Sequence, residues 1–198
     1  MRKIKVKLTL LEECLGMTPT DPNIHEEFVA SKAPDAPSME EEIEAMGVEA
    51  FVRRAMTGFP RLPDDTPFLW DYQIKGMFKD ACGMLRRVPE SKSARQMKAY
   101  KKVIDGNIFV NPRKIPFALS GEMGNCQRPL RAQTAQGEGV SLANSETIPA
   151  GSSIAFEIVC MNESDLDVVK EWLDYGELRG LGQWRNAGFG RFKWEEVK

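Results

Sequence analysis

The feature that most constrains the fold of this sequence is a strict alternation of residue types near the N-terminus. In residues 3–10 (KIKVKLTL), Lys or Thr alternates with Ile, Val or Leu. Because successive side chains of a β-strand point to opposite faces, this pattern predicts a strand with one face on a core. Residues 192–197 (FKWEEV) predict a second strand at the other end of the chain. We expect these two strands to be neighbours in one sheet.

The segment between the two ends alternates helical and strand patterns. Residues 71–88 carry apolar residues at helical spacing, which form one buried stripe: Ile74, Met77, Phe78, Ala81, Cys82 and Leu85. From residue 103 the period is mostly two, and the candidate strands are 103–110, 114–119, 127–133, 138–146 and 153–160. A further helix is expected over 165–176, after a cap at Asn162 or Ser164. The sequence therefore predicts an α+β protein.

Capping signals predict helices in the N-terminal third as well. Asp21 followed by Pro22 is typical of a helix start, and Ser38 with Glu41 forms a capping box that opens a second helix. We expect one domain over residues 1–198, with residues 11–66 as an acidic helical insertion. The charged segment 88–102 is a candidate basic arm.

Composition excludes several classes of protein. Hydrophobic residues make up 42% of the chain and charged residues 28%, which favours a packed domain over disorder. No apolar run reaches the roughly 18 residues that a membrane helix needs, and the N-terminus lacks the apolar core of a signal peptide, so we expect a cytoplasmic protein. The four cysteines are scattered without a CxxC pair and there is one histidine, so we expect reduced thiols, no structural metal and no cofactor.

Charge is distributed unevenly along the chain. Residues 71–133 contain 13 Lys and Arg against 5 Asp and Glu, a net charge of +8, whereas the segments on either side are each −5. A basic block of this kind suits a surface that neutralises phosphates. The alternative is that it pairs with the acidic ends of the same chain.

Residues 180–190 (GLGQWRNAGFG) are the most informative motif. Four glycines, Gly180, Gly182, Gly188 and Gly190, occur within eleven residues, so the backbone of this loop can approach a ligand closely. The spacing is not a dinucleotide-binding fingerprint, and the loop follows a helix and precedes a strand, which is the reverse of that motif's order. No P-loop lysine is present.

This glycine loop, together with two other segments, resembles the RAMP superfamily of CRISPR-associated RNA-binding proteins. FLWDYQIKGMFKDA (68–81) resembles the family's "pyIPGSSLKGalR" helix start, and IPAGSSIAFEI (148–158) resembles its "vpaGtxFxfei" strand. In order and spacing the three segments are similar to a backbone-type subunit that coats guide RNA. Trp70, Asp71 and Tyr72 depart from the family pattern, since they replace small residues. The chain also resembles proteins encoded by phages.

The resemblance implies a ferredoxin-like core, related to the RNA-recognition fold, and non-catalytic binding of single-stranded RNA. Glycine-loop N–H groups suit phosphates, arginines add charge, and Trp184 offers a surface for an unpaired base. The expected RNA contacts are Lys75, Lys79, Arg128, Arg131, Gly180, Gly182, Trp184, Arg185, Gly188, Gly190 and Arg191. CRISPR effector proteins, or further copies of the chain in a filament, are the other partners implied.

Three alternatives remain at this stage. Trp184 and the glycines are also consistent with a core aromatic and a tight turn. A phage-encoded mimic of an effector subunit would use the acidic N-terminal third to bind a basic protein. The third alternative is cleavage of RNA. A metal-independent endoribonuclease would use His25 as its general acid or base, whereas a RAMP-like subunit that cleaves a target would use an aspartate after the first strand, for which Asp35, Asp64 and Asp65 are the candidates.

Overall fold

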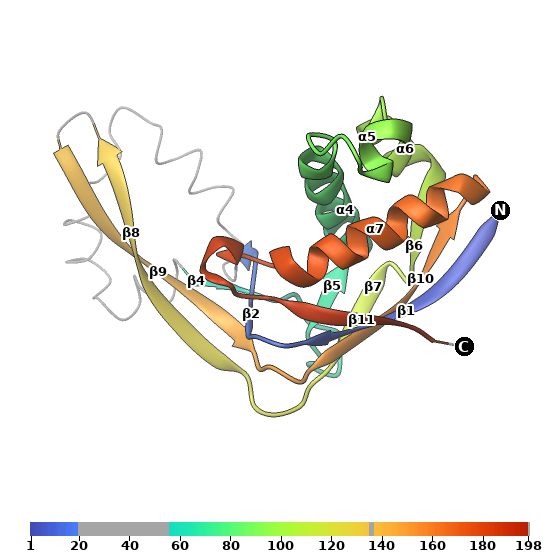
Figure 1. The fold of residues 1–198 in the computed structure, drawn as a ribbon. Helices are drawn as coiled ribbons and strands as arrows, with labels where there is room; N and C mark the ends of the chain where they lie inside the picture. The colour runs from blue at the N-terminus through green and yellow to red at the C-terminus, as the bar shows by residue number, and fades with distance from the viewer. Residues whose placement is uncertain (20–55, 135–136, 198) are drawn as a thin grey trace, which may run out of the picture.

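A computed structural model describes residues 1–19, 56–134 and 137–197 of this chain. Its larger sheet has the strand order β11-β1-β10-β7-β5, with β6 also paired to β10. The elements of this part are β1 (Arg2–Leu10), β5 (Phe68–Trp70), α4 (Asp71–Leu85), β6 (Ile108–Asn111), β7 (Lys114–Ala118), β10 (Ser153–Cys160), α7 (Glu163–Arg179) and β11 (Phe192–Val197). Figure 1 shows α4 and α7 on the same face of this sheet.

These elements form a ferredoxin-like arrangement. In chain order they are strand β1, helix α4, strands β6 and β7, strand β10, helix α7 and strand β11, and in the sheet β1 and β10 occupy the centre. Both central strands pair antiparallel with their neighbours. The expected pairing of the first and last strands is confirmed, because Lys5 lies opposite Val197 and Leu10 opposite Phe192. The α+β, ferredoxin-like prediction is therefore correct.

The core lies between the sheet and the two long helices. The apolar residues of β1 are buried while its lysines face outward, as their alternation predicts. The expected stripe of α4 is buried from Ile74 to Cys82. On α7, the fully buried Trp172 packs on Phe78 of α4 with ring centres 5.6 Å apart, and its indole N–H donates to Ser93 Oγ at 2.9 Å. The buried face of β1 and the buried stripe of α4 thus line the same core.

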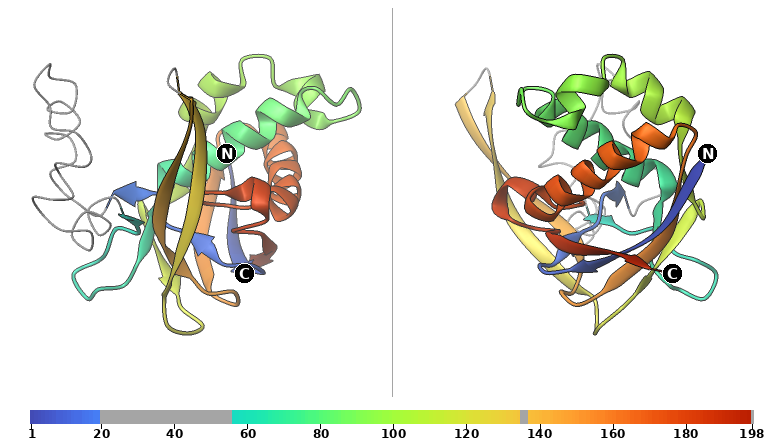
Figure 2. Two further views of the ribbon diagram at one scale, coloured as in Figure 1. Left: turned by 90° about the vertical axis from the view of Figure 1, so that its left-hand side faces the viewer. Right: turned by 45° about the vertical axis from the view of Figure 1, so that its right-hand side comes forward.

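Segments between the elements of the larger sheet form a second, separate sheet. It consists of β2 (Cys14–Leu15), β3 (Thr18–Pro19), β4 (Met56–Gly58), β8 (Gly124–Thr134) and β9 (Gly137–Ile148). Strands β8 and β9 form a long antiparallel hairpin that projects from the body of the molecule in Figure 1 and in the right-hand view of Figure 2. The near end of this hairpin pairs with β2 and β4, which brings it beside the end of α7.

One expected strand differs from the structure. The expected strand 103–110 is wrong in its first half, since α6 (Tyr100–Asn107) is a helix and β6 begins only at Ile108. Tyr100, Val103 and Ile104 have helical spacing, and the buried Ile104 follows that period rather than a period of two.

Part of the basic segment 88–102 lies against the helical layer. Residues Lys92–Gln96 form the short helix α5, and Glu171 of α7 accepts hydrogen bonds from its first turn, from the Lys92 N–H at 2.7 Å and the Ser93 N–H at 3.0 Å.

Of the expected insertion 11–66, the structure describes only the two ends, residues 11–19 and 56–66, which contain β2, β3 and β4. The two helices expected after Asp21 and Ser38 lie outside the described residues. Across the described ranges, no helix is both long enough and apolar enough to cross a membrane.

Candidate nucleic-acid interface

The glycine loop, residues 180–190, lies with Arg191 between the end of α7 and β11 and packs tightly on itself. A Cβ placed on Gly190 would lie 1.8 Å from the carbonyl oxygen of Leu181, and its φ of +72° is one that other residues rarely adopt. At Gly182, a Cβ would lie 2.8 Å from the carbonyl oxygen of Leu15. Gly188 differs, because a Cβ there meets nothing within 4 Å. Packing therefore requires glycine at positions 190 and 182, whereas Gly188 borders open space.

Hydrogen bonds fix the loop to the rest of the chain. The Gly190 N–H donates to the carbonyl of Glu13 at 2.7 Å, and the Leu181 N–H donates to that of Gly190 at 2.9 Å. The thiol of Cys14 lies 3.7 Å from the Leu181 carbonyl oxygen, and burial raises the pKa of this thiol to about 12, so it stays neutral. The N–H groups of Gly180 and Gly188 also donate within the chain. These loop N–H groups serve the turn itself.

Two arginines of the loop region share one carboxylate. Asp80 Oδ2, on α4, accepts from Arg185 at 2.9 Å and from Arg179 at 3.2 Å. Arg179 also donates to the side-chain oxygen of Asn186. Two guanidinium groups carry one charge more than a single carboxylate neutralises. The cluster therefore ties the loop to α4 and leaves a net positive charge beside it.

A groove of about 340 Å³ separates α4 from the loop. Its lining residues are Met17, Tyr72, Gln73, Gly76, Met77, Leu181, Gly182 and Arg185. Tyr72 is 58% exposed. One helical turn further along α4, Gly76 has no side chain to fill the groove. A smaller hollow of about 250 Å³ lies on another part of the loop and is lined by Glu12, Ala187, Gly188, Phe189 and Arg191. We call the loop with this groove and hollow the loop face.

Trp184 is held in a stack within the loop face. Its ring is nearly parallel to that of Phe189, with centres 5.1 Å apart and planes at 12°, and the guanidinium of Arg128 lies 5.3 Å from its centre. Trp184 is 42% exposed. Two neighbours therefore fix the Trp184 ring, which is still partly open to solvent.

Arg128 brings a buried charge to this stack from the hairpin. It is only 6% exposed, donates to Gln183 Oε1 at 2.6 Å and to Ser145 Oγ at 3.3 Å, and its Nε has no hydrogen-bond partner. No carboxylate of the described ranges forms an ion pair with it. A buried charge is normally paired, and this guanidinium has no carboxylate partner within the described ranges.

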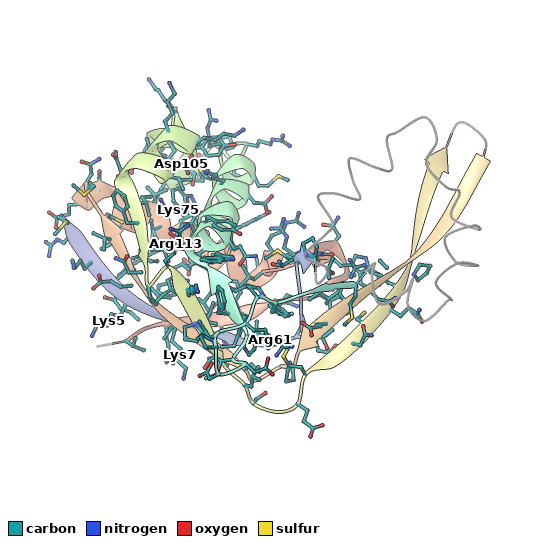
Figure 3. All side chains as sticks on the ribbon, turned by 180° about the vertical axis from the view of Figure 1, so that it is seen from behind. Lys5, Lys7, Arg61, Lys75, Asp105 and Arg113 are labelled. Atoms are coloured by element: carbon teal, nitrogen blue, oxygen red, sulfur yellow. The ribbon has the colours of Figure 1, made fainter. Side chains whose placement is uncertain are left out.

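The two lysines expected at the interface lie on another face of α4. Lys79 forms an ion pair with Asp105 of α6 at 2.6 Å, while Lys75 donates to the Asp105 carbonyl at 3.3 Å and lies 5.0 Å from the ring centre of Phe109. Figure 3 shows Lys75, Asp105 and Arg113 together on the side opposite to the view of Figure 1. These lysines are therefore separate from the loop, which instead places Trp184 beside Arg128, Arg185 in the groove and Arg191 at the smaller hollow.

The remaining candidates are placed as follows. Arg131 lies on β8 opposite Val140, in a part of the hairpin whose side chains are outside the described residues, as are His25 and Asp35 altogether. Asp64 lies in an exposed turn, where a hydrogen bond from the Thr66 N–H lowers its pKa. Asp65 pairs with Arg61 at 3.7 Å. No group of three or more His, Cys, Asp or Glu side chains suited to a metal occurs within the part of the chain that the structure describes.

Three residues of the site, Tyr72, Gln183 and Phe189, were not among those expected to bind RNA. Phe189 and Gln183 lie inside the glycine motif, but only their contacts with Trp184 and Arg128 reveal a role. Tyr72 had a signal, because an aromatic residue there departs from the RAMP pattern.

Comparison with known proteins identifies the fold. No family model matches this sequence, and no curated protein matches it. The structure is similar to a chain of the cryo-EM structure of the Type III-B Cmr-beta bound to cognate target RNA, with a TM-score of 0.54 and 13% identity. The match covers 99% of this chain and 58% of that one, so this chain spans less than two thirds of its neighbour's length. This chain therefore shares the fold of a chain in the Type III-B Cmr-beta structure, which is bound to target RNA.

Proposed function

We propose that this chain binds single-stranded RNA along the loop face and does not cleave it. The observation that carries the proposal is the positive charge that gathers there without full neutralisation. Arg128 is buried without a carboxylate among the described residues, and Arg179 and Arg185 share Asp80. Phosphate groups are anions that guanidinium groups bind well. An RNA backbone supplies the missing negative charge.

Exposed aromatic rings favour an unpaired strand over a duplex. Tyr72 and Trp184 are both exposed; Tyr72 lines the same groove as Arg185, and the Arg128 guanidinium lies over the Trp184 ring. Bases of a single strand stack on aromatic side chains, whereas bases within a duplex already stack on one another. The combination of rings and arginines is typical of proteins that bind single strands.

The fold gives separate support. The RAMP resemblance and the likeness to a chain in an RNA-bound complex agree with an RNA ligand. Partner proteins of a CRISPR effector complex, and copies of the chain arranged along one guide-like RNA, belong to the same proposal.

We expect wild-type protein to raise the fluorescence anisotropy of a labelled single-stranded RNA, with an affinity that falls steeply as salt rises. Arg185→Gln is expected to weaken binding about tenfold, because one charge-assisted hydrogen bond is lost. The plot of log affinity against log salt should become shallower by about 0.7 for the lost phosphate contact. The measurement is a titration at several salt concentrations.

Arg95→Gln is the matched control, since Arg95 is exposed on α5 and pairs with Glu90 at 2.7 Å, apart from the loop face. Binding that is absent at low salt, or equally weakened by both variants, contradicts the proposal. A gel of the recovered RNA should show unchanged lengths. Shortened RNA that His25→Ala restores to full length would instead identify an endoribonuclease, and co-purification with a protein but no nucleic acid would favour the mimic.

A further inference from the structure

The start of α4 carries a stack of two aromatic rings that no part of the RAMP resemblance explains. Trp70 and Tyr72 lie nearly parallel, with ring centres 6.1 Å apart and planes at 14°. Trp70 is half-buried as the N-cap of α4, whereas Tyr72 is 58% exposed. One ring thus supports another that faces solvent.

The inner ring is fixed from several sides. Phe68 meets Trp70 edge-on at 5.0 Å, and the Arg113 guanidinium and the Lys114 ammonium lie 5.5 Å and 5.6 Å from its centre. Trp70 also pairs with Lys114 across β5 and β7. Cations on an aromatic face are attracted by its negative quadrupole. Trp70 is therefore a rigid support.

The outer ring lines the groove of the loop face. Tyr72 contributes to its wall on the α4 side, while Gly182 and Arg185 contribute from the loop. At Gly76, a Cβ would meet nothing within 4 Å, so the helix leaves space one turn beyond Tyr72. A nucleotide base in this groove would lie against the Tyr72 ring, and the phosphate of the same nucleotide would have Arg185 within the same groove.

We infer that Tyr72 is a stacking surface for one unpaired base of single-stranded RNA in this groove. The inference rests on the proposed function and adds a base-binding position to it. Stacking is tolerant of sequence because every base has a π-face, so this position holds any of the four bases. Tyr72 contributes through its ring, and Arg185 holds the phosphate of the same nucleotide.

Removing the ring tests this directly. Tyr72→Ala is expected to weaken RNA binding about tenfold, within the range of stacking contributions. Tyr72→Phe keeps the ring and should bind as wild type does. The slope of affinity against salt should stay the same in both variants, because no charge is removed. Anisotropy titrations measure all three proteins, and thermal melts confirm that each is folded.

A strand that lacks bases separates stacking from every other role of Tyr72. With an abasic oligonucleotide, wild type and Tyr72→Ala should bind equally. Phe109→Ala is the matched control, since Phe109 is 42% exposed on β6 and packs on Lys75 instead of lining the groove. If wild type binds RNA with the expected salt dependence and Tyr72→Ala binds equally well, this inference is wrong and the proposed function stands. If wild type binds no RNA, both fail.

Discussion

Gly190→Ala is expected to destabilise the chain by about 4 kcal/mol and to abolish RNA binding at the loop face. The added methyl group would lie 1.8 Å from the Leu181 carbonyl oxygen, and that atom belongs to the backbone, so the loop itself has to move. Movement breaks the hydrogen bonds from Leu181 to Gly190 and from Gly190 to Glu13. Left-handed backbone at a non-glycine residue costs about 1 kcal/mol, and the remainder comes from overpacking and lost hydrogen bonds.

Gly188→Ala separates the clash from the backbone strain. Gly188 also has a positive φ, of +91°, but its Cβ would meet nothing within 4 Å. We therefore expect a cost of only about 1 kcal/mol there. Urea unfolding of the two variants, followed by RNA titration, makes the comparison. Equal destabilisation of the two variants would contradict the packing that we describe for this loop.

Arg128→Met is expected to leave stability unchanged or raise it by about 1–3 kcal/mol while weakening RNA binding about tenfold. Arg128 is buried with an unpartnered Nε and has no carboxylate partner among the described residues, and a buried charge without a counter-ion is costly to the folded chain. Methionine retains most of the apolar contact and removes that cost. The lost affinity comes from the charge that no longer attracts phosphate at the Trp184 stack.

Arg128→Lys is the companion variant, because it keeps the charge and loses the two-pronged contact with Gln183 and Ser145. It should bind RNA better than the methionine variant. Thermal melts and RNA titrations of both variants test this account. A methionine variant that unfolds at much lower temperature and binds RNA as wild type does would show that Arg128 serves the fold alone.

The fold was largely predictable because its signals are local. Alternation in β1 and the apolar stripe of α4 each report the face that a residue buries, and both were correct. The error at 103–107 arose because two adjacent apolar residues, Val103 and Ile104, fit the spacing of a helix and of a strand equally well. Only packing of this segment against α4 decides that it is a helix.

The site was less predictable because it depends on contacts between distant segments. Successive residues on a helix point about 100° apart, so Lys79 faces α6 while the next residue, Asp80, holds Arg185 of the loop. The sequence pattern placed Lys79 and Asp80 on one helix but did not reveal which neighbouring element each of them contacts. Arg128 reaches the loop because β8 pairs with β9, and no local pattern reports that contact.

Ultraviolet crosslinking to a single-stranded RNA, with the crosslinked peptides identified by mass spectrometry, shows where on the surface RNA binds. We expect crosslinks in the peptides that contain Tyr72, Trp184 and Phe189, and their loss when salt is raised. Crosslinks confined to the outward face of the sheet, where Lys5 and Lys7 lie in Figure 3, would contradict binding along the loop face. A complete absence of crosslinks at low salt would contradict it as well.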